Sequence, residues 1–128
     1  MDEPIITNIT AGAGLTTPEP FVRSVRVLLS PLLQPGIADV AMGYTEVPPG
    51  HHGSRHNHPS AAEIWMFISG TGRASVGDIE VETGPGTVVY TPPGVHHQFF
   101  NSGPDPVKIY YVYSPSGPER DIIDGEFR

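Results

Sequence analysis

Apolar and polar side chains alternate in short runs along this chain, and glycine, proline or other turn-forming residues bound each run. Such alternation is typical of β-strands, in which successive side chains point to opposite faces. No segment longer than a turn shows the apolar spacing of an amphipathic helix. The pattern predicts eight strands, at 21–29, 37–47, 64–69, 73–76, 79–83, 87–91, 98–101 and 107–113.

Many short strands with almost no helix predict an all-β domain, an antiparallel double-sheet jelly-roll barrel over residues 21–113. A chain of 128 residues has the length of one domain. Residues 1–20 are polar and rich in turn-forming residues, so we expect an N-terminal arm that is flexible or follows an edge of the barrel. We expect the C-terminal extension, residues 114–128, to pack on the barrel or to fray from it.

Composition removes several classes of function. The formal net charge is −7, and the 7 lysines and arginines are scattered, so the chain lacks the basic face of a nucleic-acid-binding protein. It has no cysteine, which excludes a disulfide framework and thiolate chemistry. No apolar run is long enough to span a bilayer, and the N-terminus does not resemble a signal peptide. We therefore expect a soluble, cytoplasmic protein with neither nucleic acid nor membrane as a partner.

All six histidines fall within two short stretches of the sequence. His56 and His58 are two residues apart, so on an extended strand their side chains would share a face. Pro59 begins a loop-like stretch, after which a hairpin would bring Glu63 back towards them. His97 follows a Pro-Pro-Gly turn in the second stretch. Three imidazoles and one carboxylate form a partial coordination shell for a divalent metal.

The spacing of these residues resembles the two signature motifs of the cupin superfamily. The first, G-x5-H-x-H-x4-E-x6-G, covers residues 50–70, and the second, G-x5-P-x-G-x2-H-x3-N, covers residues 86–101. The resemblance implies a small cupin of the type-2 conserved-barrel family. It also implies one bound divalent metal ion, for which iron or manganese fits best and nickel or zinc is an alternative. The implied ligands are His56, His58, Glu63 and His97.

Apolar and aromatic side chains near these ligands are candidates for a substrate pocket. Trp65 and Phe67 share strand parity with Glu63, so both should point into the barrel. Trp65 suits a pocket wall and a core position equally, whereas Phe67 suits the core better. The candidate pocket residues are Trp65, Phe67, Met42, Tyr90, Phe99 and Tyr111. From this lining we expect a small substrate that is neutral or weakly acidic and partly aromatic or apolar.

Three classes of function remain open. The first is a non-haem Fe(II)- or Mn(II)-dependent dioxygenase, favoured because the expected interior has aromatic rings and no spare carboxylate or lysine. The second is a non-redox lyase, isomerase, decarboxylase or polyketide-type cyclase, in which the metal polarises a carbonyl group. The third is a protein that binds a small molecule without catalysis.

We also expect a homodimer. The apolar strand 21–29 continues into Leu32 and Leu33, and one small barrel would not cover both of its faces. Large exposed apolar patches are rare on monomers. Small cupins similar to this one often pair through strands at the start of the chain.

Overall fold

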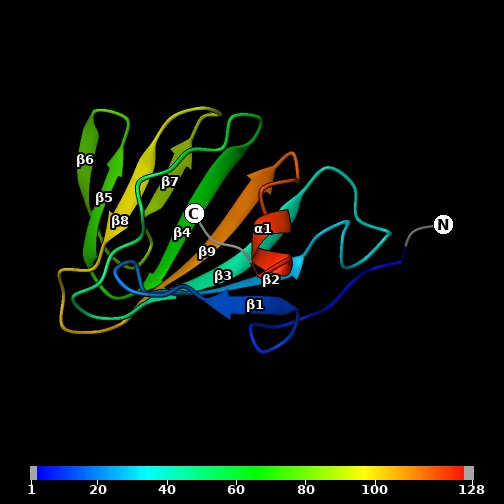
Figure 1. The fold of residues 1–128 in the computed structure, drawn as a ribbon, viewed down its shortest axis with the longest axis horizontal. Helices are drawn as coiled ribbons and strands as arrows, with labels where there is room; N and C mark the ends of the chain where they lie inside the picture. Colours follow the sequence, from blue (N-terminus) through cyan, green and yellow to red (C-terminus); the bar gives the residue numbers. More distant parts are fainter. Residues whose placement is uncertain (1–2, 126–128) are drawn as a thin grey trace.

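Two antiparallel β-sheets face each other in the computed structural model, which describes residues 3–125 (Figure 1). In the larger sheet the order is β1-β2-β3-β9-β4-β7, and in the smaller sheet it is β6-β5-β8. This architecture confirms the predicted all-β, double-sheet jelly roll. The strands are β1 (Ala13–Thr16), β2 (Ser24–Leu29), β3 (Ala41–Val47), β4 (Ala62–Ser69), β5 (Gly72–Val76), β6 (Ile79–Thr83), β7 (Val88–Thr91), β8 (His97–Phe100) and β9 (Val107–Ser114).

The first strand was not predicted. β1 lies within the segment that we expected to be an arm, and it pairs with β2 so that Leu15 lies opposite Val25. Its four residues alternate in burial, but Gly12 and Gly14 hid this alternation in the sequence. The arm therefore adds an edge strand to the larger sheet and places the Leu15 side chain beside the barrel interior.

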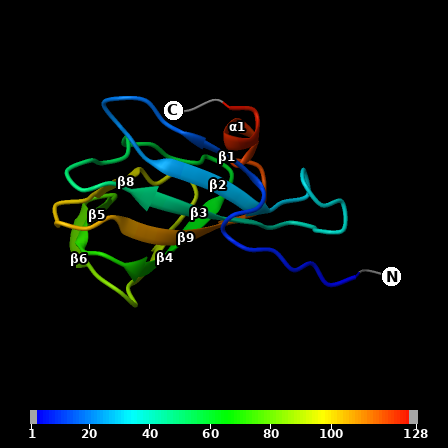
Figure 2. The same cartoon turned by 90° about the horizontal axis from the view of Figure 1, so that it is seen from below.

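The C-terminal extension folds back on the start of the chain. After β9 it forms one short helix, α1 (Arg120–Ile123), which lies against β1 and β2 (Figure 2). The fully buried Glu119 accepts hydrogen bonds from the Ser30 hydroxyl at 2.7 Å and from the Gly117 backbone N–H at 2.6 Å. These bonds fix α1, and Ile122 joins the hydrophobic core. Across residues 3–125, no helix is long and apolar enough to cross a membrane.

Strand alternation decides which side chains face the interior. In β9 the buried set is Val107, Ile109, Tyr111 and Tyr113, and Tyr110 is turned outwards. The Tyr111 hydroxyl donates a hydrogen bond to the Arg26 carbonyl oxygen at 3.0 Å. The Tyr111 side chain passes over Gly43 of β3, where a Cβ atom would collide with both the tyrosine hydroxyl and the Arg26 carbonyl oxygen. Glycine at this position is what lets the tyrosine cross the sheet.

Two of the predicted pocket residues lie on the outer face of the larger sheet. Met42 has the opposite parity to the buried Ala41, and Tyr90 is 60% exposed. The prediction that Met42 and Tyr90 line the pocket is therefore wrong. Both faces of β3 and β7 carry apolar side chains, so the hydrophobic pattern alone does not show which face is turned inwards.

The apolar segment that suggested a homodimer is mostly buried within a single chain. Val27 and Leu28 are buried, and β1 covers the edge of β2. Leu33 packs against the core, whereas Leu32 is 42% exposed. The homodimer stays a prediction, and the N-terminal strand gives it less support than the sequence suggested.

Candidate metal centre

A loop and two strands bring the four predicted ligands together. His56 and His58 lie in the loop between β3 and β4, and not on a regular strand as the sequence suggested. Two bridges, His52 with Phe100 and His56 with His97, hold this loop against β8. In the second, the backbone N–H groups of His56 and His97 each donate to the other residue's carbonyl oxygen, at 3.1 and 2.8 Å. The Gly94 N–H donates to the His58 carbonyl oxygen at 3.0 Å and fixes the Pro-Pro-Gly turn. Glu63 enters from β4.

The four side chains converge on one point. One ligand-type atom from each of His56, His58, Glu63 and His97 lies within 4.8 Å of the others. Glu63 Oε1 is 3.2 Å from His58 Nε2 and 2.8 Å from His97 Nε2. His58, Glu63 and His97 are buried, and His56 is partly buried and borders a cavity.

Backbone carbonyl groups orient two of the imidazoles. His56 Nδ1 lies 2.9 Å from the Ser54 carbonyl oxygen, and His97 Nδ1 lies 3.2 Å from the Val95 carbonyl oxygen. A carbonyl oxygen only accepts, so each Nδ1 carries a proton, and each Nε2 is the ring nitrogen left for a metal. Such second contacts fix the tautomer and the ring orientation of metal-binding histidines.

Trp65 orients the carboxylate. Its indole N–H donates a hydrogen bond to Glu63 Oε2 at 2.8 Å, which leaves Oε1 turned towards the histidines. The two residues are neighbours on the inner face of β4, and Trp65 is buried. The sequence placed Trp65 in the wall or in the core, but it did not reveal this hydrogen bond.

The electrostatics of the cluster favour the protonation states that bind metal. Burial, and then the nearby His97, lower the pKa of His56 to about 3, so this imidazole is neutral near pH 7. Burial alone would raise the pKa of Glu63, but the contacts with the His58 and His97 imidazoles outweigh it and lower the pKa. The site thus presents a neutral His56 imidazole and an ionised Glu63 carboxylate, the forms of these two groups that bind metal.

The burial of the ligand atoms also fits a bound divalent metal. Glu63 Oε1, His58 Nε2 and His97 Nε2 are fully buried, and none has a hydrogen-bond partner of acceptable geometry among the described residues. Buried polar atoms without partners are costly, and three such atoms that face one another are satisfied by a shared cation. The buried cluster could therefore bind a metal ion, although its geometry does not select which one.

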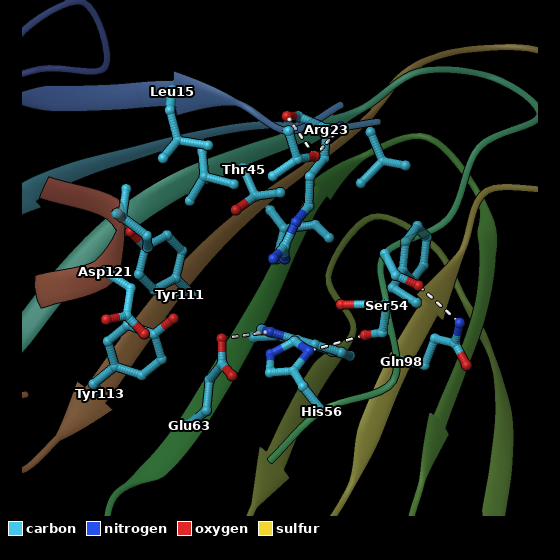
Figure 3. A pocket seen from close by; sticks show the side chains of 18 residues that line it. Leu15, Arg23, Thr45, Ser54, His56, Glu63, Gln98, Tyr111, Tyr113 and Asp121 are labelled. Carbon is cyan, nitrogen blue, oxygen red and sulfur yellow. Dashed lines mark hydrogen bonds between the residues drawn. The ribbon is translucent and has the colours of Figure 1, made fainter. Parts of the chain in front are cut away.

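A cavity of about 40 Å³ adjoins the cluster and is bordered by His56 and Glu63 (Figure 3). Three of the predicted pocket residues, Trp65, Phe99 and Tyr111, contribute to its lining. Phe67 does not. It is 2% exposed and packs behind the wall, with its ring centroid 6.1 Å from that of Trp65 and 5.3 Å from that of Phe99. Phe67 is thus a core residue.

Two charged residues of the lining were missed in the sequence. Arg23 precedes β2 and extends its guanidinium group into the cavity, and Asp121 reaches it from α1 (Figure 3). Arg23 has the same parity as the buried Val25 and Val27, which is a signal that could have found it. No comparable signal exists for Asp121, because alternation along a strand does not show how a terminal helix packs. The expectation of an interior without a spare carboxylate is therefore wrong.

Comparison with known proteins identifies the class. The cupin domain family matches residues 43–113, more than half of the chain, and the protein belongs to this family. An uncharacterized protein of Methanocaldococcus jannaschii is 29% identical over 97 residues, which is 76% of this chain and 77% of that one.

Two further proteins are similar to this chain. A glucose-6-phosphate isomerase of Thermococcus kodakarensis is 38% identical over 66 residues, which is 48% of this chain but only 35% of that enzyme. The crystal structure of a predicted oxalate decarboxylase from Thermotoga maritima superimposes with a TM-score of 0.76 at 19% identity, covering 88% of this chain and 100% of that one. This last likeness concerns the fold.

Proposed function

We propose that this protein is a metal-dependent enzyme that acts on a small organic molecule by non-redox chemistry, as a lyase, isomerase or decarboxylase. The observation that carries the proposal is that Asp121 borders the same cavity as His56 and Glu63 of the ligand cluster. A bound divalent ion would supply Lewis-acid polarisation of a substrate oxygen. The similarity to part of a glucose-6-phosphate isomerase, which also has a non-redox reaction in its name, supports the proposal.

The lining residues divide the remaining work. Asp121 is the group suited to take a proton from the substrate and return it, since proton transfer needs a carboxylate or a similar group within reach of the reacting atom. Tyr111 does not compete for this role, because burial and the Glu63 charge raise its pKa and its hydroxyl is bonded to a backbone carbonyl. Trp65 and Phe99 exclude water from the apolar wall.

The second candidate is an iron- or manganese-dependent dioxygenase. The aromatic wall formed by Trp65 and Phe99 favours it, because oxygen chemistry needs little from the protein beyond the metal site and a dry cavity. Three imidazoles and one carboxylate suit Fe(II) and Mn(II). Asp121 has no evident task in this reaction, which is why we rank it second.

The test begins with the metal content of protein purified without added metal. Short oxo and hydroxy acids, diketones, catechols and phenols are then assayed for turnover in air and without oxygen, with an oxygen electrode. We expect turnover that persists without oxygen and falls by about 10²-fold or more in Asp121→Asn, with unchanged metal content. Asp124→Asn is the matched control, because Asp124 ends the same helix but is exposed.

Each other outcome decides against the proposal. Oxygen consumption in step with product would replace it by the dioxygenase. Binding of substrates without any turnover would favour a small-molecule-binding protein, and protein without a bound or bindable metal would remove the basis of both enzymes.

A further inference from the structure

We propose that Arg23 makes the cavity a carboxylate-binding site and that the substrate is a short carboxylic acid with a second oxygen, such as a 2-oxo or 2-hydroxy acid. This inference rests on the proposed function and names its substrate class. The substrate's carboxylate would bind the Arg23 guanidinium, and its second oxygen would point towards the His56 and Glu63 side of the cavity.

Arg23 has an unusual environment for an arginine. Its Nε atom is fully buried and has no hydrogen-bond partner, and within residues 3–125 no carboxylate oxygen lies within 4.0 Å of its guanidinium. Arg23 as a whole is partly buried, but a fully buried guanidinium N–H without an acceptor is costly. A planar guanidinium with vacant donors matches the two oxygens of a carboxylate. The missing anion is therefore best supplied by a ligand.

Hydrogen bonds hold the backbone of Arg23 in place, and its guanidinium points into the cavity. Its N–H donates to the Thr17 hydroxyl at 2.9 Å, and its carbonyl oxygen accepts from the Thr17 N–H at 2.9 Å. Thr17 is itself 4% exposed. Arg23 and His56 border the same cavity. The donors of Arg23 thus lie beside the candidate metal centre.

The charge of the loaded cavity also favours an anion. A divalent ion together with Arg23 would exceed the combined charge of Glu63 and Asp121, and bound ions dominate the local field in such sites. The cavity would then be positive inside a chain whose net charge is −7. This local field would draw in a small anion, whereas the overall charge disfavours large polyanions.

The cavity size limits the ligand. Its volume is about 40 Å³. So small a space favours a ligand of few heavy atoms, such as glycolate, over one with an aromatic ring. We therefore replace our sequence-based expectation of a partly aromatic substrate with that of a short, polar acid.

The only tryptophan of the chain gives a direct measurement of binding, because Trp65 lies in the cavity wall. Its fluorescence is titrated with glycolate and with glycolamide, an uncharged molecule of nearly the same shape. The titrations use metal-free protein and protein loaded with Zn(II), so that the contribution of Arg23 is separated from that of the metal. We expect saturable binding of glycolate and little or none of glycolamide.

Three variants complete the test. Arg23→Gln should weaken glycolate binding about tenfold or more in both forms, while metal content stays unchanged, and Arg23→Lys should be intermediate because it keeps the charge but loses the fork. Arg55→Gln is the matched control, since Arg55 precedes a ligand histidine but is exposed. It should bind glycolate as the unaltered protein does. The Arg23 side chain makes no hydrogen bond within the described residues, so Arg23→Gln should fold, and Arg23→Lys decides the matter if it does not.

The inference is overturned if Arg23→Gln binds glycolate normally, or if glycolamide binds as tightly as glycolate. These results leave the proposed function intact, because that function depends on metal content, turnover and Asp121. Conversely, Arg23-dependent binding of glycolate without turnover of any short acid would refute the enzyme and keep the carboxylate site.

Discussion

Replacing Trp65 by phenylalanine tests whether the indole N–H holds the candidate metal ligand Glu63 in place. The change keeps an aromatic ring in the wall but removes the 2.8 Å hydrogen bond to Glu63 Oε2. A hydrogen bond to a charged, buried acceptor contributes about 1.5–3 kcal/mol. If that energy orients the carboxylate, loss of the bond should weaken divalent-metal affinity about 10–100-fold, the usual effect of removing such a supporting contact.

The assay is competition with a chromophoric chelator, using Zn(II) and Mn(II), together with thermal melting of the metal-free protein. Phe67→Leu is the matched control, because Phe67 is on the same strand and the same inner face, is also buried, and packs its ring against Trp65 and Phe99. Phe67→Leu should lower the melting temperature and leave metal affinity unchanged. Equal metal affinities for Trp65→Phe and the unaltered protein would show that Trp65 is only a packing residue.

Three further predictions concern the cluster and the surface. His58→Ala should lose most of its bound metal and the stability that the metal confers, whereas full metal content at an unchanged melting temperature would contradict the ligand assignment. Metal-free protein should lose about 1.4 kcal/mol of unfolding free energy per pH unit as the pH falls below 6.5, the ordinary pKa of histidine, because His56 takes up a proton in the unfolded chain but, with a pKa of about 3, not in the folded state. The lowered pKa of Glu63 acts in the same direction at lower pH. Denaturant titrations that give equal stability from pH 6.5 to 4 would refute this prediction. The protein should be a homodimer by light scattering at micromolar concentration. If the outer face of β7 is the contact, the double variant Val88→Arg, Tyr90→Arg should dissociate the dimer, because these side chains are 65% and 60% exposed. A monomer mass for the unaltered protein would exclude the dimer.

Much of the barrel could be predicted from the sequence because strand alternation is a local property. The eight predicted strands are present, although β2 and β3 begin later than expected and β4 begins earlier. The four candidate ligands could also be found, because fixed spacing around two turns brings them together. The loop conformation of His56 and His58 could not be predicted, since isolated bridges to β8 replace the expected strand.

Side-chain facing was less predictable where both faces of a strand are apolar. Met42 and Tyr90 lie on the outer face although their side chains are largely apolar, like those of the inner face. In β3 the inner face contains Gly43, which is required by the crossing of Tyr111 from a strand distant in sequence. Such long-range packing leaves no local signal.

The cavity has two walls of different origin, and this explains why the family assignment does not give the reaction. The candidate ligands all lie within residues 43–113, which the cupin domain family matches. Arg23 and Asp121 border the same cavity but lie outside that region, on segments before and after it. Asp121 is held in place by the buried contact between Glu119 and Ser30, which ties α1 to the N-terminal half of the chain. On our proposals, the shared region would supply the metal site, whereas the terminal segments would supply the charges that bind and process a substrate. Proteins that share only the central motifs can therefore bind the same metal and still catalyse different reactions.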